Sequence, residues 1–110
     1  MPTPPTTAAD GEIRKPPIRE ILQGRIMRLE EKKFRIWLAK QGWQVRHQQV
    51  AKTMLSTFIE EWARVLNGVW FHNPELVCIG VTRETVIKMK VPAWMTDYIN
   101  SYPRAEWPEV

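Results

Sequence analysis

The apolar residues of one stretch, residues 46–67, follow the repeat of an α-helix more clearly than any others in the chain. Apolar side chains recur there at spacings of three and four residues, which places them on one helical face. They are Ala51, Met54, Leu55, Phe58, Ile59, Trp62, Val65 and Leu66. Gly68 follows Asn67 and can supply the left-handed residue that ends a helix. The pattern predicts a central core helix over about 46–67, against which the other segments must pack.

A second helical region is predicted between Pro17 and Gly42. Proline is accommodated at the first position of a helix, and glycine commonly follows the last. The apolar residues between these two follow helical spacing: Ile21, Leu22, Ile26, Leu29, Phe34, Trp37 and Leu38. We expect a break near Gly24 or near residues 30–33. A hairpin over residues 25–38 is the alternative, but Glu, Lys, Arg, Leu and Met dominate the region and favour helix.

Residues 76–91 have two interpretations. The segment after Gly80 resembles the second half of a helix-turn-helix motif, in which Gly80 forms the turn and Thr82 caps a basic recognition helix. The resemblance implies DNA contacts by Arg83, Thr85 and Lys88. In the other interpretation, the strands "LVCIGV" and "VIKMKV" form a β-hairpin around the loop "TRET". The density of β-branched residues slightly favours the hairpin.

Prolines mark several segment boundaries. Residues 1–16 hold four of the nine prolines and few large apolar residues, which predicts a flexible lead-in. Residues 69–75 are expected to form a connector, and Pro92 and Pro103 to delimit a short helix. Its buried face would hold Trp94, Met95, Tyr98 and Ile99. Residues 17–110 are then a single globular domain of mainly α class, or of α+β class if residues 76–91 form a hairpin.

Positive charge is concentrated in the first half of the sequence. The whole chain has a net charge of +4. Residues 14–52 hold eleven basic residues but only three acidic ones, Glu20, Glu30 and Glu31. Such a surface attracts an anionic partner, and phosphate neutralisation is the mechanism that we expect. The residues of this block that we predict to contact nucleic acid are Arg25, Arg28, Lys32, Lys33, Arg46 and Lys52.

Catalytic and metal-binding patterns do not stand out. His47 and His72 are far apart, and neither has a further ligand at metal-binding spacing. Glu60 and Glu61 are adjacent on the predicted helix, so they point to different sides and are more typical of solvated residues than of a catalytic pair. Cys78, the single cysteine, lies in an apolar run and is expected to be a small buried hydrophobe. We therefore expect no enzyme, no cofactor and no metal site.

The chain has six tryptophans, which is unusual for its length. Trp37 and Trp62 lie on predicted apolar helical faces, and we expect both in the core. Stacking on single-stranded nucleic acid needs exposed aromatic rings among basic side chains, and the surroundings of Trp37 and Trp43 fit that pattern best. A protein-binding patch made of aromatic residues is the competing use. Its predicted members are Trp70, Phe71, Trp94 and Trp107.

Together these features predict a small nucleic-acid-binding protein, with DNA as the expected ligand and a regulatory or accessory role. The alternative is a protein-interaction module, such as an adaptor, an inhibitor or a small subunit of a larger assembly. The small size also suits a homodimer. The apolar runs are far shorter than the roughly 20 residues that a membrane-spanning helix needs, and a single cysteine suits a reducing compartment. We therefore expect a cytoplasmic protein that has no membrane partner.

Overall fold

The computed structural model describes residues 17–65 and 67–104. Its elements, in chain order, are α1 (Ile18–Met27), α2 (Glu31–Gln41), α3 (Gln48–Trp62), β1 (Val69–Asn73), β2 (Leu76–Gly80), β3 (Val86–Lys90) and α4 (Ala93–Asn100). The fold class is α+β, so the expectation of a mainly α domain is right only in part. The predicted lead-in, residues 1–16, lies outside the described residues, as do Leu66 and Trp107.

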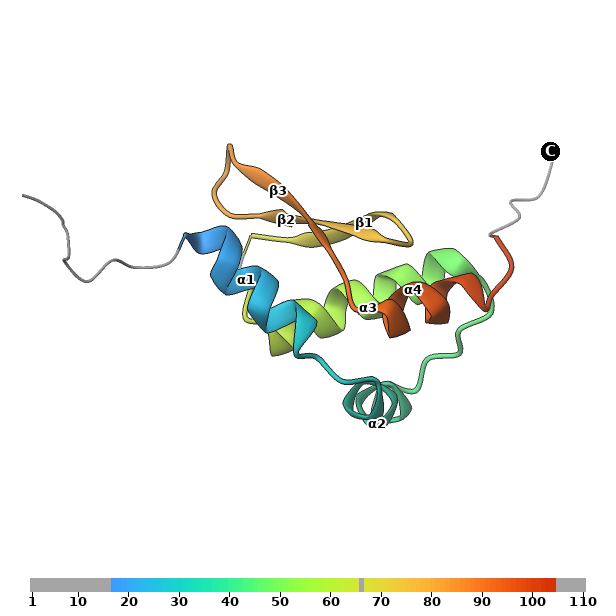
Figure 1. Ribbon diagram of the computed structural model, residues 1–110. Coiled ribbons are helices and arrows are strands. Elements are labelled where there is room, and N and C mark those ends of the chain that lie inside the picture. Colours follow the sequence, from blue (N-terminus) through green and yellow to red (C-terminus); the bar gives the residue numbers. More distant parts are fainter. Residues whose placement is uncertain (1–16, 66, 105–110) are drawn as a thin grey trace, which may run out of the picture.

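The three strands form one antiparallel sheet in the order β1-β2-β3. Figure 1 shows α1, α3 and α4 on one side of this sheet and α2 farthest from it. α3 packs against β1, and α1 contacts β3. One core cluster of buried apolar residues joins the helices to the inner face of the sheet. The described helices therefore cover one face of the sheet and leave the other open.

Helix α3 is the predicted central helix, but it ends at Trp62 rather than near residue 67. The left-handed residue that ends it is Arg64, with φ of 59°. The amide of Val65 donates to the carbonyl oxygen of Glu60 at 3.2 Å, which is the long-range bond of a Schellman motif. The chain then turns into β1. Trp62 is consequently exposed, and its predicted place in the core is wrong.

The region between Pro17 and Gly42 forms two helices, as the helical interpretation requires. The break lies at residues 28–30, next to the predicted position at 30–33 and not at Gly24. Gly42 ends α2 with φ of 75°, as predicted. The alternative hairpin over residues 25–38 is wrong.

Residues 76–91 form a β-hairpin, which confirms that interpretation and excludes the helix-turn-helix. Leu76 of β2 pairs with Lys90 of β3, and Gly80 pairs with Val86. Thr82 does not cap a helix. Its hydroxyl oxygen instead accepts hydrogen bonds from the amides of Glu84 and Thr85, at 3.2 and 3.0 Å, and so fixes the loop between the strands.

The prediction is wrong for the segment before this hairpin and confirmed for the helix after it. Residues 69–73 form strand β1 instead of the predicted connector, with Val69 pairing with Ile79. Helix α4 has the predicted limits, and it buries Met95, Tyr98 and Ile99. Trp94 is partly buried, and its indole N–H donates to the Leu29 carbonyl oxygen at 2.9 Å.

Aromatic rings from three helices meet around Phe34 of α2. The ring of Phe34 lies 5.2 Å from Phe58 of α3 and 5.1 Å from Tyr98 of α4, measured between centroids. Both pairs are edge-to-face, the arrangement that aromatic quadrupoles favour. Burial and a hydrogen bond with Tyr102 raise the pKa of the Tyr98 phenol well above its usual value, so that this ring stays neutral in the core.

We predict that Gly80→Ala lowers the free energy of unfolding by about 1–3 kcal/mol, the usual cost of overpacking. A Cβ at this position would overlap the carbonyl oxygen of Asn67, and backbone cannot move aside easily. Urea denaturation measures the change.

Gly24→Ala is the matched control. A Cβ there meets only the Arg28 side chain at 3.7 Å. Because alanine is the better helix former, this variant should gain up to about 1 kcal/mol. A Gly80→Ala protein as stable as the Gly24→Ala protein would contradict the close approach of β2 to Asn67.

Candidate nucleic-acid interface

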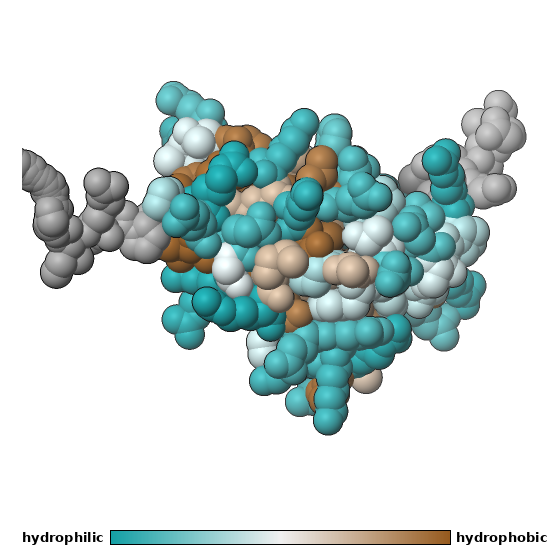
Figure 2. Space-filling model, in the orientation of Figure 1, coloured by the Kyte–Doolittle hydropathy of each residue, from teal (hydrophilic) through white to brown (hydrophobic). Residues whose placement is uncertain are grey.

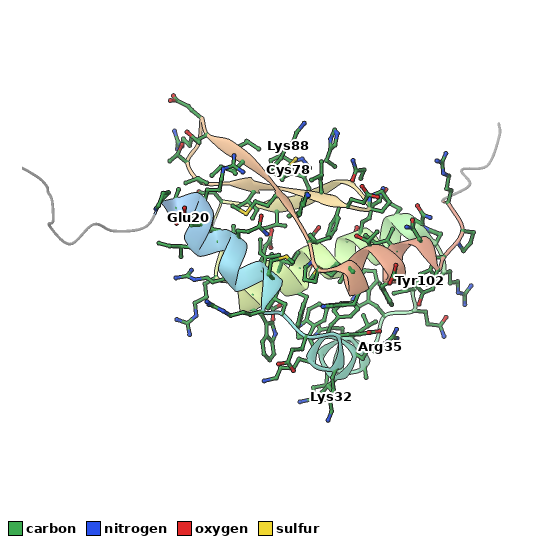
Figure 3. All side chains as sticks on the ribbon, in the orientation of Figure 1. Glu20, Lys32, Arg35, Cys78, Lys88 and Tyr102 are labelled. Carbon is green, nitrogen blue, oxygen red and sulfur yellow. The ribbon has the colours of Figure 1, made fainter. Side chains whose placement is uncertain are left out.

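The open face of the sheet carries the side chains that alternate with the core residues of the strands. Inward-pointing residues such as Val77, Ile79 and Met89 are buried against the helices. Strand alternation places Trp70, Cys78 and Lys88 on the opposite side. Figure 3 shows Cys78 and Lys88 on the side of the sheet away from the helices. This open surface, called the outer face below, is the candidate interface.

Trp70, Cys78 and Lys88 form one row across the outer face. Trp70 of β1 pairs with Cys78 of β2, and Cys78 pairs with Lys88 of β3. Cys78 is only 4% exposed although it points away from the core, whereas Trp70 is 46% exposed. Cross-strand neighbours are close enough to cover a small side chain between them. Trp70 and Lys88 therefore shield Cys78, which is buried as predicted, and present their own ends to solvent.

Helix α1 extends this row by one guanidinium group. Nη1 of Arg19 donates to the carbonyl oxygen of Lys88 at 2.9 Å. One turn further on, the side-chain amide of Gln23 donates to the carbonyl oxygen of Lys90 at 2.8 Å. These bonds satisfy backbone groups along the outer edge of β3, which would otherwise be free to pair with another strand. They also bring a second positive charge next to Lys88.

Acidic residues lie at the margins of the outer face. None of the three strands contains Asp or Glu. Glu84 lies in the loop before β3, and Glu75 and Asp97 line a hollow beside Lys90. Lys90 therefore has carboxylates near it. The most positive part of the face is the row that ends in Lys88 and Arg19.

The structure separates the predicted contact residues into three groups. Arg83 and Thr85 lie in the exposed loop between β2 and β3, and Lys88 lies on the outer face. Arg25, Arg28, Lys32 and Lys33 lie on α1 and α2 or between them. Arg46 precedes α3, and Lys52 lies within its first turns. Because α2 is the element farthest from the sheet, these groups do not form a single contact surface (Figure 1).

Two residues of the second group have contacts within the fold. Nη1 of Arg25 donates to the carbonyl oxygen of Ala63, at the end of α3, at 3.3 Å. The ammonium group of Lys33 lies 5.8 Å from the centroid of the Trp62 ring, within the range of a cation–π interaction. These basic side chains help to hold the helical layers together.

Lys52 of the third group borders a polar cleft of about 500 Å³. Lys52, His72 and Arg104 contribute basic groups to its wall, and no acidic residue lines it. Arg46 lies outside this wall and donates from Nη2 to the side-chain oxygen of Gln44 at 2.7 Å. The cleft lies at the end of β1, where His72 connects it to the outer face.

Sequence reasoning assigned Trp70 to a protein-binding patch rather than to a nucleic-acid interface, and it did not single out Arg19. It favoured Trp37 and Trp43 for base stacking, but Trp37 is buried and its indole N–H donates to Glu61 at 3.0 Å. Trp43 is 61% exposed and follows the end of α2. Period-two alternation in "VWFHN" is the signal that could have placed Trp70 on an open sheet face.

Comparisons with protein-family models, with curated proteins and with solved structures give no match for this chain. In residues 17–65 and 67–104, no cluster of His, Cys, Asp and Glu could hold a metal ion. Among the helices of the same residues, none has the length and apolar character that crossing a bilayer requires. The outer face must therefore be interpreted from its own chemistry.

We predict that Trp70→Thr makes Cys78 react faster with a thiol reagent in the folded protein. Threonine suits a strand but is too small to shield the neighbouring sulfur. Because Cys78 is the single cysteine, absorbance of the released thiolate reports this site alone. Trp43→Thr, which changes an exposed ring elsewhere, should leave the rate unchanged. Equal rates in all three proteins would show that Trp70 does not cover Cys78.

Proposed function

We propose that this chain is a nucleic-acid-binding protein with an accessory or regulatory role in the cytoplasm, and that it binds through the outer face of the sheet. The observation that carries the proposal is the row of Trp70, Cys78 and Lys88, extended by Arg19. It combines an exposed aromatic ring with two positive charges on a rigid support. Rings contact bases, and ammonium and guanidinium groups contact phosphates.

The scarcity of ion pairs among the described residues supports a polyanionic ligand. Within the described part of the chain, Arg35 and Glu31 form the only ion pair, at 2.8 Å. Glu60 and Glu61, expected to be solvated, instead accept hydrogen bonds from the amide of Val69 and the indole of Trp37. Most of the positive charge is consequently available for long-range attraction of a polyanion.

Within this proposal, the predicted contact residues have unequal parts. Lys88 lies at the centre of the interface, and Arg83 and Thr85 lie at the end of the hairpin, where they would contact the backbone of a longer ligand. Lys52 and Arg46 would act beyond the β1 end of the face. Arg25, Arg28, Lys32 and Lys33 would contribute to the overall attraction rather than to direct contacts.

A protein-interaction module is the second candidate, and exposed apolar residues on α2 favour it. Ile36 is 52% exposed, and Trp43 lies beyond the end of the same helix. The predicted aromatic patch does not assemble, because Trp70 is on the outer face and Trp94 packs among the helices. On the side of the molecule shown in Figure 2, hydrophilic residues predominate and apolar ones are scattered. The nucleic-acid hypothesis therefore has the better-organised surface.

We predict that the double variant Arg19→Ala, Lys88→Ala binds mixed-sequence DNA about tenfold more weakly than the wild type at low salt. Loss of two phosphate contacts should also reduce the slope of log affinity against log salt by about 1.5. Fluorescence anisotropy over a salt series measures both quantities.

Lys32→Ala, Lys40→Ala is the matched control, because it removes the same charge from exposed positions on α2. We expect a loss below about twofold, from the reduced long-range attraction only. If the two double variants lose affinity equally, the outer face is not the interface. If wild-type affinity does not fall with salt, the proposed function is wrong.

A further inference from the structure

We infer that the ligand of the outer face is single-stranded nucleic acid, with one base stacked on the exposed ring of Trp70. This inference rests on the proposed function and specifies its substrate class. In a duplex, the faces of the bases are occupied by their neighbours in the stack. An exposed aromatic ring can therefore take up a base only where the strand is unpaired.

The position of Trp70 leaves room for a stacked base. One edge of the ring lies near Gly68, because its Cζ3 atom is 3.9 Å from the place where a Cβ of Gly68 would be. Gly80 lies beside Gly68, and its amide donates to the Gly68 carbonyl oxygen at 2.9 Å. Asn67 covers the Gly80 side, where a Cβ of Gly80 would overlap its carbonyl oxygen, so this end of the face is closed. A planar group can approach Trp70 on the part of its ring that faces solvent, since the residue is 46% exposed.

The positive charges of Lys88 and Arg19 lie at a distance from Trp70 that suits the phosphate backbone of the same nucleic-acid strand. Trp70 and Lys88 are on the outer strands of the sheet with β2 between them. Adjacent strands are about 4.8 Å apart, so the Cα atoms of these residues are about 10 Å apart. Only the small side chain of Cys78 separates them. A base on Trp70 and a phosphate near Lys88 and Arg19 can therefore belong to one short segment.

The other exposed tryptophans of residues 17–65 and 67–104 lack this combination. Trp62 already has the ammonium group of Lys33 near its ring. Trp43 follows Gly42, at the end of a helix and outside any regular element, so it is not held on a rigid support. Trp70 is held by a paired strand, with its backbone in register with Cys78. Among the three, Trp70 is the one built into a surface that also carries positive charge.

A direct comparison of single-stranded and duplex DNA tests the inference. The probes are a labelled 12-nucleotide strand of mixed sequence and the duplex formed with its complement, measured by anisotropy at one salt concentration. We expect the full chain to bind the single strand at least about tenfold more tightly than the duplex. Trp70→Thr should weaken single-strand binding about tenfold, the effect of losing one stacked base, and change duplex binding by less than twofold.

Trp70→Phe keeps an aromatic ring and should retain most of the single-strand affinity. If the role of Trp70 were only structural, the Phe and Thr variants would not differ in their affinity for the single strand in this way. Trp43→Thr is the matched control and should bind as the wild type does. Thermal melting of each variant checks the fold, and the Phe variant keeps the test informative if the Thr variant is unstable.

The possible results separate the two proposals. Equal binding of strand and duplex, unaffected by Trp70→Thr but weakened by Arg19→Ala with Lys88→Ala, would overturn the single-strand inference and leave the proposed function in place. If neither probe binds, both are wrong, and the protein-interaction alternative gains support. If Trp43→Thr causes the loss instead of Trp70→Thr, stacking occurs at Trp43, beyond the end of α2, and the inference for the outer face fails.

Discussion

Helix α3 makes contacts on two of its sides, and these contacts position the other elements. Phe58 points toward α2, where its ring meets Phe34 and Trp37. Two residues later, Glu60 points toward the sheet and accepts a hydrogen bond from the amide of Val69. A surface helix has one apolar face, but α3 lies between layers, and its six buried residues include Ser56, which is outside the apolar repeat. The sheet and α2 can therefore occupy opposite sides of it.

This arrangement determines which surface is available for a ligand. With α1, α3 and α4 on one face of an antiparallel sheet, the strands must alternate between buried and exposed residues. Strand β3 shows the alternation most clearly, since Ile87 and Met89 are buried while Val86, Lys88 and Lys90 are exposed. The edge of β3 is closed by Arg19 and Gln23. The open face is thereby left as a paired surface next to a basic helix.

The parts of the fold that depend on local pattern could be predicted from the sequence. The apolar repeat of α3, the proline before α4 and the alternation in β2 and β3 all specified the right element. The end of α3 could not be predicted in this way, because Val65 continues the helical stripe although the chain leaves the helix at Arg64. β1 was missed because it follows directly on this misplaced end. Of the candidate site, the sequence predicted Lys88 as a contact residue but assigned Trp70 to a different surface. Trp70 and Arg19 join Lys88 only through strand register and helix docking.

The contrast between the basic block and the outer face shows why charge in the sequence is a weak guide to a contact surface. Residues 14–52 are rich in positive charge, yet the fold distributes them over α1, α2 and the start of α3. Arg25 contacts the end of α3, and Lys33 lies near Trp62, so part of this charge stabilises helix packing. Arg19 differs because its helix docks on the edge of β3. There one guanidinium both satisfies a strand carbonyl and places positive charge beside Lys88, so that the contact holding α1 to the sheet also extends the charged row of the outer face.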